Sequence, residues 1–65
     1  MKNQTKEALD TVTQAILNDL AQISLDLSQT WKMPDFGYDL IVGTLPELKK
    51  KLETLEALAR HGQTL

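Results

Sequence analysis

Two pairs of acidic residues have the spacing that chemistry on a helix requires. Asp19 and Asp26 are seven residues apart and Asp35 and Asp39 are four apart, so each pair shares one helix face. Carboxylates held in this way can exchange protons in acid–base catalysis or bind a divalent cation. Either role needs burial or close approach to separate the two pKa values, and no aromatic-lined cleft is predicted around the first pair. We therefore interpret Asp19 and Asp26 as solvated residues at a helix edge, and Asp35 and Asp39 as capping or turn residues.

The other reactive side chains lack the partners that catalysis needs. The 65 residues include no cysteine and one histidine, which excludes disulfides, thiol catalysis and Cys/His zinc sites. His61 stands at the end of the last helical pattern, where it suits the negative end of a helix dipole. The hydroxyl groups have no neighbouring base to activate them. The sequence therefore predicts no enzyme, no catalytic, cofactor-binding or metal-binding residues, no cofactor and no small-molecule substrate.

Basic side chains gather at one place, in the run Lys49, Lys50 and Lys51. A helix-turn-helix with its turn at Gly43 would put Asp39 and Lys49 where small and apolar residues must pack. The net charge of −2 also repels phosphate rather than attracting it. A small helical nucleic-acid-binding regulator is therefore kept as the alternative function. An enzyme or metal protein with a site shared between subunits ranks below it.

All aromatic side chains lie within eight residues of one another. Trp31, Phe36 and Tyr38 adjoin the apolar residues Leu40 and Ile41. Such a cluster can seal one end of a small helical core, or it can anchor a partner protein, because Trp and Tyr dominate interface hot spots. These five residues are the candidate partner-binding residues, and the choice between plug and binding surface stays open.

Apolar residues recur at three- and four-residue intervals in two stretches, which is typical of amphipathic helices. The first stretch predicts a helix over about residues 5–31, ended by Pro34. Its apolar stripe is wider than one neighbouring helix can cover, which favours contact with a further helix. The candidate residues for an oligomer interface are therefore Leu9, Val12, Ile16, Leu17, Leu20, Ile23 and Leu27.

The second stretch is predicted as a helix over about residues 45–61. Thr44-Leu45-Pro46-Glu47 matches a capping box with proline in the first turn, and Gly62 suits a left-handed cap at the end. Residues 33–43 are predicted to form a connector or a short helix that Gly43 ends. A short strand there is less favoured, because the sequence offers no second strand to pair with it.

These elements predict one all-α domain over residues 1–65, a helical hairpin or small three-helix arrangement. A first helix of about 40 Å and a last helix of about 25 Å cannot cover each other. The remaining length of the first helix must lie under residues 33–44, against a second copy or against a different protein, and we favour a second copy, in a homodimer or higher helical bundle. If the two helices are antiparallel, Asp19 and Asp26 flank the same edge as Lys51, which predicts a weak Asp–Lys51 contact.

The amino-acid composition is typical of a folded chain, and no motif in the sequence identifies a family. Hydrophobic residues make up 42% and charged residues 25% of the sequence. No secretory segment and no run of about eighteen apolar residues is present, so we expect a cytoplasmic protein without membrane contact. The favoured function is a non-catalytic protein–protein interaction module, an adaptor, regulator or small chaperone that binds itself and another protein.

Overall fold

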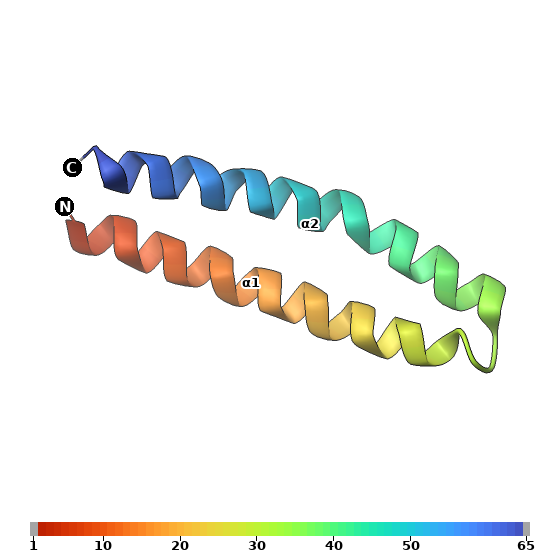
Figure 1. Ribbon diagram of the computed structural model, residues 1–65. Helices are drawn as coiled ribbons and strands as arrows, with labels where there is room; N and C mark the ends of the chain where they lie inside the picture. Colours follow the sequence, from red (N-terminus) through yellow and green to blue (C-terminus); the bar gives the residue numbers. More distant parts are fainter. Residues whose placement is uncertain (1, 65) are drawn as a thin grey trace.

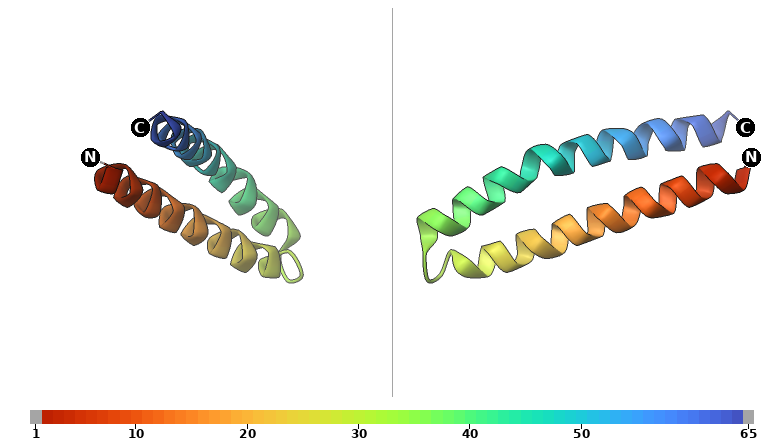
Figure 2. Two further views of the ribbon diagram at one scale, coloured as in Figure 1. Left: turned by 60° about the vertical axis from the view of Figure 1, so that its left-hand side comes forward. Right: turned by 180° about the vertical axis from the view of Figure 1, so that it is seen from behind.

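The chain folds into two antiparallel helices joined by a short turn (Figure 1). The computed structural model describes residues 2–64, in which α1 spans Lys2–Gln29 and α2 spans Pro34–Gln63. The first turn of α1 and the last turn of α2 lie side by side at the end opposite the connection (Figures 1 and 2). The predicted all-α helical hairpin is confirmed, and residues 2–64 contain no strand.

The turn between the helices occupies residues 30–33. Its amides continue the hydrogen bonding of α1. Lys32 N donates to Gln29 O, three residues earlier, at 3.0 Å in the tighter 3₁₀ pattern, and Met33 N donates to the same oxygen at 2.8 Å in the α-helical pattern. Pro34 then starts α2 at a position where its missing N–H costs nothing. The first helix therefore ends two residues before the predicted boundary at Trp31.

The second helix is continuous through residues 34–63, which corrects the prediction of a separate connector and a helix start at Thr44. The Thr44 hydroxyl does not cap a helix; Oγ1 donates to Leu40 O at 3.0 Å, one turn earlier in α2. Gly43 does not end a helix, and Gly62 does not adopt a left-handed conformation. Packing of residues 37–48 against α1 outweighs the local signals, because apolar burial stabilises a helix more than a cap does.

The two helices have nearly equal lengths, 28 and 30 residues. At 1.5 Å per residue they extend about 42 and 45 Å, so each covers the other from end to end. The prediction that the second helix leaves much of the first uncovered is therefore wrong. The exposed apolar side chains lie along the sides of the hairpin and at its connected end.

The hairpin is a single layer, and its core is correspondingly thin. Its principal extents are 48 × 15 × 11 Å, with a radius of gyration of 15.0 Å, against about 11 Å for a compact chain of this length. Among the described residues, Ile16 and Leu48 are the buried hydrophobic side chains, each 8% exposed. A stable domain ordinarily has two packed layers around its core, and one copy of this chain supplies one layer.

Candidate protein-interaction surface

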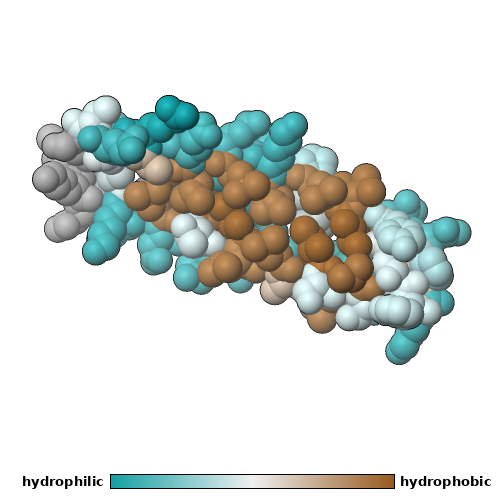
Figure 3. Space-filling model, in the orientation of Figure 1, coloured by the Kyte–Doolittle hydropathy of each residue, from teal (hydrophilic) through white to brown (hydrophobic). Residues whose placement is uncertain are grey.

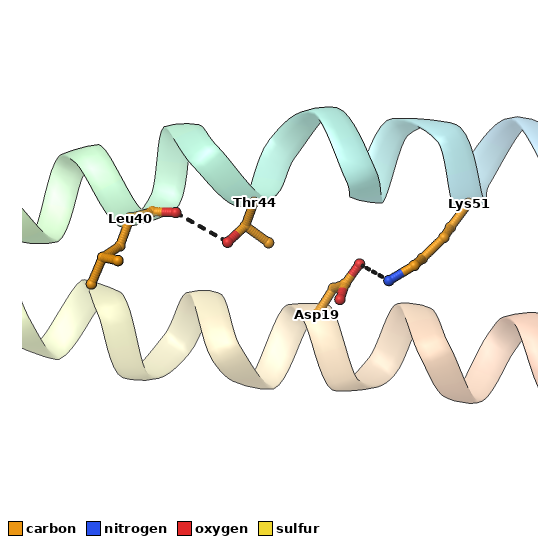
Figure 4. Close-up of polar contacts among 4 residues, drawn as sticks. All are labelled: Asp19, Leu40, Thr44 and Lys51. Atoms are coloured by element: carbon orange, nitrogen blue, oxygen red, sulfur yellow. Dashed lines mark hydrogen bonds and ion pairs between the residues drawn. The ribbon is translucent and has the colours of Figure 1, made fainter.

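An ion pair marks one edge of the seam between the helices. Lys51 Nζ of α2 lies 2.7 Å from Asp19 Oδ2 of α1, and the two side chains point toward each other across the seam (Figure 4). The predicted Asp–Lys51 contact is confirmed, and with it the antiparallel register. The side chain of Asp19 is 18% exposed, so its interpretation as a solvated residue is wrong.

Removing the charge of Lys51 should weaken the hairpin measurably. We expect Lys51→Met, which keeps most of the aliphatic stem, to lower the free energy of unfolding by about 0.5–1 kcal/mol in low salt, because Asp19 loses its partner. Urea unfolding in low salt and in 1 M NaCl measures the effect, which about 1 M salt should largely abolish. The control is Arg60→Met, because the Arg60–Glu56 pair is longer, at 3.4 Å, and both side chains are well exposed. An equal loss of unfolding free energy in Lys51→Met and Arg60→Met would show that the Asp19–Lys51 ion pair stabilises the hairpin no more than an exposed pair does.

Asp26 lies one heptad beyond Asp19 and is the most buried polar residue among those described, at 3% exposure. Its Oδ1 accepts a hydrogen bond of 3.0 Å from Gln22 Nε2 on the same helix. No buried side-chain N or O atom in the described residues lacks a hydrogen-bond partner. The prediction that Asp26 is a solvated residue at a helix edge is therefore wrong, because Asp26 is a buried, hydrogen-bonded residue of the seam.

The other acidic pair and the histidine gather no partners for chemistry. Asp35 lies in the first turn of α2, where the helix dipole favours an acid, and Asp39 is exposed. His61 is exposed in the last turn of α2, near the negative end of the dipole. The described residues contain no group of three or more His, Cys, Asp or Glu side chains that could hold a metal ion.

At four positions a polar side chain occupies the seam while the leucine that follows it stays about half exposed. The four dipeptides are Asp19-Leu20, Asp26-Leu27, Thr44-Leu45 and Lys51-Leu52. One residue is a rotation of about 100° around a helix, so both helices turn their leucines away from the centre of the seam. The pairs recur every seven residues on each helix, which places the leucines in two parallel rows.

The two rows form one exposed apolar surface on the side of the hairpin opposite the Asp19–Lys51 edge. In antiparallel helices corresponding edges meet, so the leucine rows of α1 and α2 lie next to each other. Figure 3 shows apolar side chains running over both helices on this side. We call this surface the apolar face and define it by six exposed residues: Leu17, Leu20, Leu27, Val42, Leu45 and Leu52.

The structure divides the predicted oligomer residues between the seam and the apolar face. Ile16 is buried, and Leu9, Val12 and Ile23 are partly buried. Leu17, Leu20 and Leu27 are exposed on the apolar face. The sequence interpretation missed the contribution of α2, because it named oligomer-interface candidates on the first helix only. The signal was present in the heptad spacing of Leu45 and Leu52, each directly after a polar seam residue.

The aromatic residues lie at the connected end of the hairpin and do not plug the core of a single copy. Trp31 is 89% exposed, and Phe36, Tyr38 and Met33 are each more than half exposed. We call these four residues the aromatic end. Of the two remaining predicted partner-binding residues, Leu40 is exposed and Ile41 is partly buried toward the seam.

The lysine cluster does not form one basic patch. Lys51 is engaged by Asp19, while Lys49 and Lys50 are exposed and point in different directions around α2. Because α2 is unbroken at Gly43, the chain also lacks the turn that a helix-turn-helix at this position needs within residues 34–63.

Comparison with known proteins gives no relatives. No family model, no curated protein and no solved structure matches this chain. Neither helix, over the described residues, is both long and apolar enough to span a membrane.

Proposed function

We propose that this chain is a non-catalytic protein–protein interaction module. One observation carries the proposal: twelve large hydrophobic side chains are exposed, whereas two hydrophobic side chains are buried, among the residues that the structure describes. This much exposed apolar side chain on a small chain is typical of a protein interface, because leaving it in water is costly.

Ten of these twelve residues form two surfaces of different chemistry, and Leu25 and Leu40 lie outside both. The apolar face presents leucine and valine in rows on two helices, a surface that suits packing against further helices. The aromatic end presents Trp31 and Tyr38, residue types that bury a large area at little cost in side-chain entropy. We assign binding of another protein to the aromatic end, where the wide exposure of Trp31 leaves the whole ring free for contact.

Trp31 provides the test of this function. We expect immobilised wild-type protein to capture a specific protein from a lysate of its native cell, and Trp31→Ala to reduce that capture at least about tenfold, as loss of a hot-spot side chain does. Because Trp31 makes little contact with the hairpin, its truncation should change the free energy of unfolding by less than about 0.5 kcal/mol.

Lys32→Ala is the matched control, because Lys32 is the next residue in the same turn and is also exposed. It should retain capture and helicity. Equal capture by all three baits, as measured by mass spectrometry of the eluates, would refute binding through the aromatic end. A loss of helical circular dichroism in Trp31→Ala would show instead that Trp31 has a structural role.

A further inference from the structure

We propose that a second copy of this chain covers the apolar face, so that two hairpins form a four-helix bundle. The inference rests on the proposed function, since it names the occupant of one of its two surfaces. Three observations carry it: the surface area of one copy, the shape of the apolar face, and the charges at its edge.

The area that one copy leaves exposed matches what a dimer interface removes. The hairpin has 5220 Å² of accessible surface, whereas a compact protein of 7.3 kDa has about 4,200 Å². The excess is about 1,000 Å² per chain, and a stable interface of standard size buries about 800 Å² on each partner. One identical partner is therefore large enough to cover most of this excess.

The shape of the apolar face suits a copy of itself. The face is two helices wide, and its leucines recur every seven residues on both helices, the spacing that side chains in a four-helix bundle use. Because α1 and α2 have nearly equal lengths, two stacked hairpins can cover each other along their length. Stacking supplies the second layer that one hairpin lacks and moves Leu20, Leu27, Leu45 and Leu52 from a half-exposed position into a core.

The charges beside the apolar face favour a second copy over a lipid surface. Lys49 and Glu56 follow Leu45 and Leu52 by one turn, so the edge along α2 carries both signs. Mixed charge permits opposite charges to pair between two identical edges. A helix that binds an anionic bilayer has a basic edge instead, and this chain has a net charge of −2.

Sedimentation equilibrium of the whole chain over about a hundredfold range of concentration tests the proposal. We expect the wild type to have twice the 7.3 kDa chain mass at the upper concentrations, and its melting temperature to rise with concentration. Leu20→Glu and Leu45→Glu should each raise the dimer dissociation constant at least about a hundredfold, since each buries a charge in the new core.

Leu25→Glu is the matched control. Leu25 is also well exposed on α1, but it lies about 140° around the helix from Leu20, away from the apolar face. It should keep the dimer mass. If the two face variants also lose helicity, the mass and the concentration-dependent melting of the wild type still decide the question.

A wild-type mass of one chain with cooperative, concentration-independent melting would overturn the proposal, as would a mass above two chains. Binding of a monomer to vesicles of anionic phospholipid, lost in Leu20→Glu, would assign the face to a membrane surface instead. Capture of a different protein by a monomer, lost in Leu20→Glu, would assign it to that protein. The proposed function is tested by the capture of a partner by Trp31→Ala, whereas the dimer is tested by the mass of the wild type and of the leucine variants. Either proposal can therefore fail while the other holds.

Discussion

Replacing Pro46 with alanine should stabilise the protein, by about 1–3 kcal/mol in the free energy of unfolding. Pro46 lies in the interior of α2, twelve residues after its start at Pro34. There the ring nitrogen has no proton to donate to Val42 O, and the ring crowds that carbonyl. α2 curves along its length (Figure 2), and proline is a recognised cause of helix bending. Alanine restores the donor and relieves the crowding.

Thr44→Ala tests where α2 begins, and the position of that start decides whether Pro46→Ala stabilises the protein. If a helix began at Thr44, proline would sit harmlessly in its first turn, and loss of the threonine cap would cost about 1 kcal/mol. In the observed helix the Thr44 hydroxyl bonds to Leu40 O within α2, so Thr44→Ala should change stability little. Urea unfolding at one fixed protein concentration measures both variants. A neutral Pro46→Ala together with a destabilising Thr44→Ala would show that α2 begins at the capping box.

Residues 44–47 show where local sequence signals failed. The capping-box spacing and the proline position are both correct descriptions of a helix start, and each is a local property worth about 1 kcal/mol. The seam that carries α2 past them depends on Gly37, Ile41 and Leu48, which meet α1 only after the chain has turned back. A sequence pattern does not include those distant contacts, so the predicted start at residue 45 lies eleven residues after the observed start at Pro34.

The hairpin and its register were predictable for the opposite reason. Pro34 interrupts the first helix by backbone geometry alone, and the Asp–Lys51 contact was predicted on the condition that the second helix returns antiparallel to the first. Asp19 and Lys51 occupy corresponding edges in any such register, and the structure pairs them at 2.7 Å. The pairing of Asp19 with Lys51 could therefore be predicted from the sequence, although the start of α2 could not.

The rotation of each helix about its own axis was harder to predict from the sequence. This rotation decides which side chains are exposed on the interaction surface. A seam centred on leucine would hide Leu20 and Leu45, while a seam shifted by one residue uses Asp19 and Thr44 instead. The two choices differ by the burial of the leucines, about 1.5–3 kcal/mol for each full side chain. A single hairpin is more stable when its leucines are buried between its own two helices. A four-helix bundle is more stable when they are buried between its two hairpins. The observed rotation supports the proposed bundle, and the sequence alone could not select it.

Replacing Gly37 with alanine should have the opposite effect from Pro46→Ala, lowering the free energy of unfolding by about 1–3 kcal/mol. Gly37 is buried in the first turn of α2, against the end of α1. A Cβ atom there would lie 2.8 Å from Thr30 N and 2.8 Å from Thr30 Cγ2. The side chain of Thr30 can rotate away, but the backbone nitrogen cannot, because it is fixed by its hydrogen bond to Leu27 O. The connected ends of the two helices would have to separate.

Two other glycines of α2 separate this crowding from the general preference of helices for alanine. A methyl group on Gly43 would have no atom within 4 Å, so Gly43→Ala should stabilise the protein by about 1 kcal/mol. A methyl group on Gly62 would lie 3.6 Å from Thr5 Cγ2, an ordinary contact, so Gly62→Ala should not destabilise it. Thermal and urea unfolding of the three variants at equal concentration provide the measurement. Stabilisation by all three substitutions would mean that the helices do not approach at Gly37 as closely as the hairpin requires.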